Sequence, residues 1–217
     1  MMLSLLTEQP ILFFAWLFAI FYGITVHEFA HAWAAIWQGD ETAKLAGRLT
    51  LNPLSHIDIF GLLMLVLVGF GWGKPVPVNH NNLRNGKISD NLVSLAGIFT
   101  NLISIVIFGV ILKLLILYSP LGANNLLINF LFMLMMINMV LAIFNLIPIP
   151  PLDGSHVLFN ILPERFNNFK MILAQNGPFI LLGLIIADNF LHINIFSSLF
   201  NFFFEEVYTS LPSSFIV

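Results

Sequence analysis

Residues 11–37 form an apolar run that contains three side chains of a different kind, His27, Glu28 and His31. The run is long enough to cross a bilayer, because a helix needs about 20 residues to do so. Ionisable groups inside a membrane segment are energetically unfavourable, and they usually persist there because they have a function. The run therefore predicts a membrane-spanning helix with one chemically active face.

The spacing of these side chains indicates what that chemistry is. His27 and His31 are one helical turn apart, so both imidazoles lie on one face and can reach a single zinc ion. Glu28 follows the first imidazole directly and is placed to act on a water bound to the metal. The pattern predicts a zinc hydrolase, and its apolar setting predicts an active site below the membrane surface.

The composition agrees with a membrane protein. Of the 217 residues, 59% are hydrophobic and only 9% are charged, whereas soluble domains carry about 25% charged residues. We expect residues 1–217 to form one polytopic membrane domain without a separate soluble module. The chain has no cysteine, so a metal must be held by His, Asp, Glu or Asn side chains. The net charge of −3 gives no indication of nucleic-acid binding.

The hydropathy pattern predicts an all-α fold with four transmembrane helices, at residues 11–37, 91–117, 126–147 and 178–200. The N-terminus has no basic start and no small-residue cleavage site, so the first span is expected to be retained.

A fifth apolar stretch, residues 59–71, is too short to span comfortably. Three glycines and two prolines end it, and they disfavour a continuous helix. We expect a re-entrant element around 57–80, a helix-turn or a β-like hairpin, with a short ordinary helix as the alternative.

The basic residues predict the topology. Seven of the eight Lys and Arg side chains fall in two loops, one before the second span and one before the fourth. These residues are Lys44, Arg48, Lys74, Arg84, Lys87, Arg165 and Lys170. The positive-inside rule places both loops in the cytoplasm and both termini outside, provided that 57–80 does not cross. We therefore expect a multi-pass protein of the cell membrane, with its active site toward the cytoplasmic side.

A catalytic zinc usually has three protein ligands, so a third must come from elsewhere in the chain. The candidates near membrane segments are Asp153, His56, His156, Asp58, Asp188 and His192. Asp153 stands out because prolines break the helix just before it and force an extended path. Such a path can project a carboxylate into a helix bundle.

Two motifs in this order resemble the site-2 protease family of intramembrane metalloproteases, peptidase family M50. They are His27-Glu28-x-x-His31 and Asn145-x2-Pro148-x4-Asp153-Gly154. Residues 52–58 and 71–79 resemble its short form, which lacks PDZ and CBS domains.

The resemblance implies one zinc per chain, bound by His27, His31 and Asp153. It implies Glu28 as general base and Asn145 as the group that polarises the substrate carbonyl or orients the site. It also implies zinc-dependent endopeptidase activity on transmembrane proteins or peptides in the lipid bilayer. The alternatives are a non-catalytic membrane scaffold and a metal-ion transporter that uses the same His and Asp side chains.

The chain departs from the family pattern at several positions. Residues 96–101 read Ala-Gly-Ile-Phe-Thr-Asn where the family often has Ala-Gly-Pro-x-x-Asn. His80 replaces a frequent proline, and His156 stands where Arg or another residue is expected. Asn101 could bond a neighbouring helix or support the zinc site, and His156 could support the site or simply lie at the membrane interface.

Other polar and glycine positions in the connecting segments have simpler interpretations. His56 is expected to bond within its loop, and Asp58 to cap the segment that begins at Ile59. The glycines at 69 and 71 either turn the chain or admit substrate backbone. A strand edge within 64–80 could pair with an unwound substrate segment by β-addition.

Overall fold

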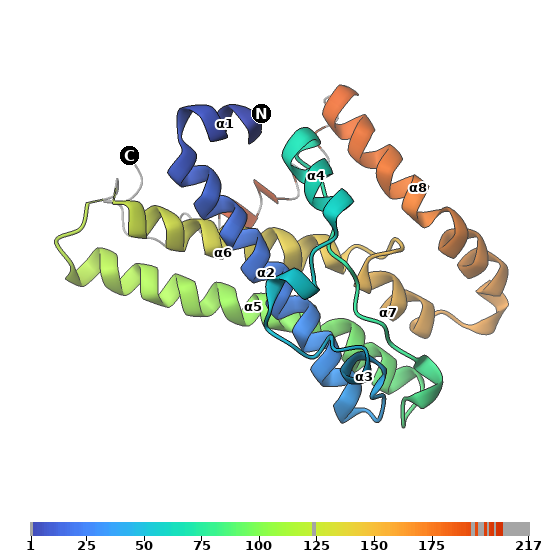
Figure 1. Cartoon of the computed structure of the whole chain (residues 1–217). Helices are drawn as coiled ribbons and strands as arrows, with labels where there is room; N and C mark the ends of the chain where they lie inside the picture. Colours follow the sequence, from blue (N-terminus) through green and yellow to red (C-terminus); the bar gives the residue numbers. More distant parts are fainter. Residues whose placement is uncertain are drawn as a thin grey trace.

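The computed structural model describes residues 2–122 and 125–191, together with 194, 198, 200, 201 and 203–205. Helix α2 (Pro10–Trp37) crosses α5 (Lys87–Tyr118) and α6 (Leu126–Leu146), which lie side by side (Figure 1). Helix α8 (Asn167–Leu191) stands at the edge of this bundle, and the shorter α7 (Asp153–Ile161) connects α6 to it.

Within the described residues, four helical segments are long and apolar enough to cross a membrane: α2, α5, α6 and Glu164–Asp188, which contains most of α8. The predicted all-α fold with four spanning helices is therefore confirmed. Three further α-helices in the described part of the chain are short: α1 (Met2–Glu8), α3 (Thr42–Leu45) and α4 (Ile59–Val68). Single 3-10 turns are η1 (Pro53–Ser55), η2 (His80–Asn82) and η3 (Glu164–Phe166).

The fourth helix begins well before its predicted start at residue 178. It starts at Asn167, and Pro178 lies inside it. The prediction was wrong here because it took the run after Pro178 as the whole span, whereas the helix already includes the apolar and helix-favouring residues 169–175 before it. Asn176 adds a bond of its own, since its side-chain amide donates to the carbonyl oxygen of Ile172. Most of the predicted end of this span, residues 192–200, lies outside the described residues.

The predicted re-entrant element combines a short helix with an extended return. Asp58 caps α4 by accepting a hydrogen bond from the Gly61 backbone N–H at 2.8 Å, as the sequence predicts. After α4 the chain turns back, and Gly73 forms an antiparallel bridge with Ile57. The Lys74 N–H then donates to the His56 carbonyl at 2.9 Å. The segment therefore leaves and returns at one place in the fold.

Close backbone contact explains two glycines of this element. A Cβ atom at Gly71 would lie 2.2 Å from the Gly61 carbonyl oxygen, and one at Gly61 would lie 2.0 Å from the Trp72 carbonyl oxygen. Gly69 ends α4 in the left-handed conformation, with φ +84°. These glycines turn the chain and let it pack on its own helix, so the space at Gly71 is already filled by protein backbone.

The core lies where α2, α5 and α6 meet. Its buried side chains are Ala19, Leu112, Ile128, Leu131, Leu134 and Met135. Large apolar side chains on the outer faces are mostly exposed, among them Phe14, Phe18, Ile103, Val106 and Val110. An apolar exterior of this extent is typical of helices that face lipid. Several polar side chains are instead buried inside the bundle, including His27, His31, Asn101 and Asn138.

Candidate metal centre

Two buried imidazoles of α2 form the base of the site. His27 and His31 are 5% and 8% exposed, and both rings face α5. Gly97 of α5 makes room for them, because a Cβ atom there would lie 2.6 Å from the Nε2 atoms of both histidines. Any larger residue would displace the rings, so close packing of α5 on α2 is a condition for this site.

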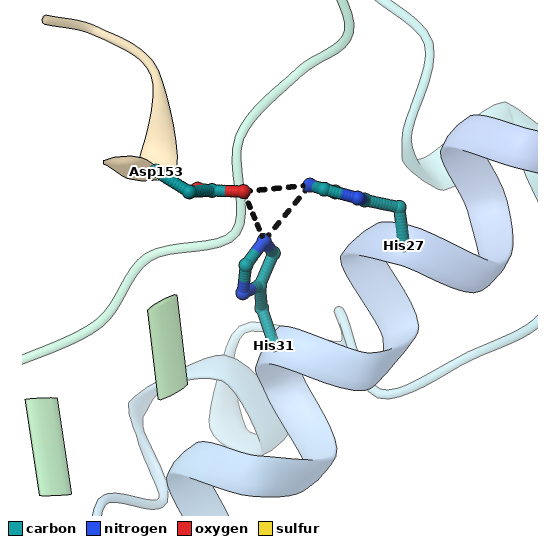
Figure 2. Close-up of side chains that lie close together, drawn as sticks. All are labelled: His27, His31 and Asp153. Atoms are coloured by element: carbon teal, nitrogen blue, oxygen red, sulfur yellow. Dashed lines mark hydrogen bonds and ion pairs between the residues drawn. The ribbon is translucent and has the colours of Figure 1, made fainter. Parts of the chain in front are cut away.

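Asp153 reaches these imidazoles from the first residue of α7. Its Oδ2 atom lies 3.0 Å from Nε2 of His27 and 3.3 Å from Nε2 of His31. The two Nε2 atoms are themselves 3.0 Å apart. Figure 2 shows the three side chains pointing toward one another, two from α2 and one from the start of α7. The structure thus brings together the three side chains that the sequence suggests as ligands.

The outer nitrogen of each ring fixes its tautomer. His27 Nδ1 lies 2.6 Å from Asn101 Oδ1, and His31 Nδ1 lies 2.7 Å from the Val93 carbonyl oxygen. A carbonyl oxygen can only accept, so His31 Nδ1 carries the proton. The Asn101 amide nitrogen already donates to Asn138 Oδ1 at 2.8 Å and to the Gly23 carbonyl at 3.2 Å. Its oxygen therefore accepts from His27 Nδ1.

These tautomers leave both Nε2 atoms with lone pairs directed at each other and at the carboxylate of Asp153. Asp153 Oδ2 is buried and has no hydrogen-bond partner. Three electron-pair donors in such close contact repel one another unless a cation lies among them. Ligands at about 2.1 Å from a tetrahedral zinc ion lie about 3.4 Å apart, close to the spacing found here. The donor set fits zinc and leaves a fourth position open.

Glu28 and Asn145 line the same cavity, which has a volume of about 530 Å³. One carboxylate oxygen of Glu28 accepts a hydrogen bond from the Val76 backbone N–H at 2.8 Å. The Asn145 amide donates to the carbonyl oxygen of Leu141, one turn earlier in α6, at 3.0 Å. The extended segment after α4 therefore forms one wall of the cavity and holds the carboxylate in place.

The other candidate ligands lie elsewhere or lie outside the described residues. His56 is buried, with Nε2 2.8 Å from the Thr50 carbonyl and Nδ1 3.4 Å from Arg48, so it bonds within its loop as predicted. Asp58 caps α4, Asp188 lines a separate cavity, and His192 lies outside the described residues. His156 lies in the wall of the 530 Å³ cavity but not in the ligand cluster.

Sequence reasoning missed three contributions to this site: the space provided by Gly97, the Val76 contact with Glu28, and the bond from Asn101 to Asn138. The sequence does contain one signal for the third contribution: an amide side chain in the middle of an apolar helix predicts a hydrogen bond to a neighbouring helix. That prediction was made for Asn101 but not for Asn138.

Comparison with known proteins agrees with the class of protein that this fold and cluster define, a membrane metalloprotease. The sequence profile described as "Peptidase family M50" matches residues 115–184, which include Asn145 and Asp153. YwhC of Bacillus subtilis (strain 168), which bears the name of a zinc metalloprotease, is 41% identical over 159 residues, 72% of each chain. No solved structure gives a significant match.

A second relative is Rip2 of Mycolicibacterium smegmatis (strain ATCC 700084 / mc(2)155), also named as a zinc metalloprotease. It is 28% identical over 193 residues, 85% of this chain and 68% of the relative. The chain belongs to peptidase family M50, the site-2 protease family. It is an integral membrane metalloprotease, and zinc is its metal.

Proposed function

We propose that this protein is an intramembrane endopeptidase that hydrolyses peptide bonds in or near transmembrane segments of its substrates, and that residues 1–217 act as one polytopic domain. One observation carries the proposal. Asp153 meets His27 and His31 of the membrane-spanning helix α2, in a cavity that Glu28 also lines. These three side chains would hold the zinc ion.

Each polar group of the cavity then has a role. When bound, zinc supplies Lewis-acid polarisation of the scissile carbonyl and makes water acidic enough to react near neutral pH. The Glu28 carboxylate, oriented by the Val76 N–H, accepts the proton of the attacking water and delivers it to the leaving amine. The amide of Asn145 has a second N–H beyond the one that Leu141 accepts, and this N–H donates to the developing oxyanion.

An apolar cavity beside the metal centre supports a membrane substrate. It has a volume of about 410 Å³, lies between α2, α4 and α6, and is lined by side chains such as Trp16, Phe21 and Leu65. Residues 70–73 line both this cavity and the one at the metal centre. An apolar substrate segment seated there would have its backbone close to the zinc ligands. A substrate helix must unwind first, because its carbonyls are engaged in its own hydrogen bonds.

The extended return after α4 remains the proposed site for strand addition. Its Val76 N–H is already engaged with Glu28, so a substrate strand would have to pair with other backbone groups of this segment. Substrates with Gly, Pro or Asn near the cleaved bond should be cut faster, because such residues lower the cost of unwinding by roughly 1 kcal/mol or more each.

The test is cleavage of transmembrane peptides by the purified protein in lipid vesicles, with fragments identified by mass spectrometry. Glu28→Gln should reduce the rate by about 10²–10⁴-fold while zinc stays bound, because only the base is lost. Glu41→Gln is a matched control, since Glu41 is half exposed, pairs with Lys44 at 3.0 Å and does not line the cavity. Cleavage by Glu28→Gln at the wild-type rate would overturn the assignment. Zinc binding without any cleavage would favour the scaffold or transporter alternatives.

A further inference from the structure

A second group of metal-ligating side chains lies in the wall of the catalytic cavity. His80 of η2, Asp90 of α5 and His156 of α7 each offer one ligand atom, and these atoms lie within 4.8 Å of one another. Nδ1 of His80 is 2.8 Å from Oδ1 of Asp90. The rings of His80 and His156 stack with centroids 5.6 Å apart and an interplanar angle of 20°. All three residues line the 530 Å³ cavity together with the zinc ligands.

We propose that His80, Asp90 and His156 form a second divalent-metal site, which takes Zn²⁺ or a similar imidazole-preferring ion and restrains the catalytic cavity when occupied. Two imidazoles and one carboxylate suit zinc, nickel and copper rather than calcium or magnesium. The two histidines meet at one place, with stacked rings, although 76 positions separate them in the chain. The metal would replace the proton that His80 Nδ1 shares with Asp90.

The carboxylate of this second site is already oriented. The Oδ2 atom of Asp90 accepts a hydrogen bond from the Asn160 amide at 2.7 Å, and the same amide donates to Asn91 Oδ1 at 2.8 Å. Partners of this kind hold a ligand in position and raise metal affinity. The His80 side chain is 53% exposed, so its imidazole can rotate to close the coordination sphere. Because the site is open to water, it should bind metal more weakly than the buried centre.

The second site connects the two elements that complete the catalytic centre. His156 is one turn after Asp153 on α7, and His80 follows the extended segment whose Val76 N–H orients Glu28. A metal bound between them joins this segment to α7 across the cavity wall. Occupation should therefore restrict substrate entry and inhibit cleavage when zinc is in excess. The inhibition rests on the proposed function, whereas the binding does not.

Metal binding is measured on the full chain in detergent micelles. The protein is first loaded with one equivalent of Zn²⁺, and further Zn²⁺ is then added in competition with a chromophoric chelator. Wild type should bind a second, weaker equivalent. His80→Asn and His156→Gln should each lose it and keep the first, and Asn160→Ala should weaken it by about tenfold. Asn81→Ala, at an exposed neighbouring position, should keep both equivalents.

Binding of Cu²⁺ to the zinc-loaded protein, followed by electron paramagnetic resonance, should show nitrogen ligation that both histidine variants remove. A single equivalent in wild type, or a second equivalent that both variants retain, would overturn the site. In the cleavage assay, excess Zn²⁺ should inhibit wild type more than His80→Asn. Equal inhibition of the two would overturn the regulatory role. A wild type without cleavage would count against the proposed function, while the binding titration would still decide the site.

Discussion

Nδ1 of His27 on α2 donates to Oδ1 of Asn101 on α5, across 2.6 Å in the buried interior of the bundle. Asn101 in turn donates to Asn138 of α6, and Asn138 donates to the Leu134 carbonyl within its own helix at 2.7 Å. Three membrane helices are thus linked by one chain of hydrogen bonds in a single direction. That direction leaves the Nε2 lone pair of His27 free to bind the metal at the proposed site.

Replacing Asn101 should weaken zinc binding without removing a ligand. Asn101→Leu leaves His27 Nδ1 without an acceptor, so the ring can turn or change tautomer, and zinc affinity should fall by about 10–100-fold. Asn101→Asp keeps an acceptor and should bind zinc more tightly than Asn101→Leu. Competition with a chelator of known affinity measures both variants. Asn176→Leu, on an exposed face of α8, is the control. Wild-type affinity in Asn101→Leu would show that the bond does not position His27.

Gly97→Ala should abolish zinc binding, because its Cβ atom would lie 2.6 Å from both imidazole Nε2 atoms. Gly109→Ala on the same helix is the matched control, since its Cβ atom would meet only the Met135 sulfur, at 3.4 Å. Alanine favours a helix over glycine by about 1 kcal/mol, so the control should be as stable as wild type or more stable. Zinc content and thermal unfolding distinguish the two. A zinc-loaded Gly97→Ala protein would contradict the packing argument.

Val76→Pro removes the N–H that holds Glu28, and it should lower the cleavage rate by roughly tenfold, the effect of losing a hydrogen bond to a charged group. Zinc should remain bound, because no ligand changes. The flanking prolines already favour an extended backbone, so the substitution should be tolerated. Val76→Ala removes the side chain but keeps the N–H, and it should cleave at nearly the wild-type rate. If both variants cleave alike, the backbone contact does not orient the base.

The predicted topology can be tested by cysteine labelling, since the chain has no cysteine of its own. Single cysteines at Lys44 and Arg165 should be protected from a membrane-impermeant reagent added outside intact cells. A cysteine at Gly122, in the loop between α5 and α6, should react and serves as the positive control. Reaction at Lys44 or Arg165 from outside would place a basic loop on the other side of the membrane.

Asp40 should contribute stability that depends on pH. Its burial alone would raise the pKa, but hydrogen bonds from Thr42, Asn79 and Asn82 outweigh burial and hold the pKa of Asp40 below the usual value of 3.8. The ionised form is therefore favoured by folding, and its contribution is lost as the pH falls below 3.8 through the lower, folded-state pKa.

Asp40→Asn should lower the unfolding temperature at neutral pH, by an amount that shrinks under strongly acidic conditions. Thermal unfolding in micelles at several pH values measures this. Glu41→Gln, the exposed neighbour, should show no such dependence. A destabilisation that stays constant down to acidic pH would mean that the charge of Asp40 is not the source.

The sequence alone determined the spanning helices and the polar face of the first one. Length and hydropathy define α2, α5 and α6 to within a few residues, because about 20 apolar residues in a row have few other ways to satisfy their backbone in lipid. Helical spacing places His27 and His31 on one face. The start of α8 was not predicted correctly, because hydropathy does not show how far a helix continues beyond its most apolar stretch.

Only the tertiary structure decided which groups surround the imidazoles. Membrane helices are apolar on nearly every face, so their sequences carry little periodic signal for which helix packs against which. The contact of Gly97 with the two rings, the bond from Asn101 to His27 and the contact of Val76 with Glu28 all join positions far apart in the chain. They exist because α5 and the return after α4 pack on α2, and no local pattern specifies that packing.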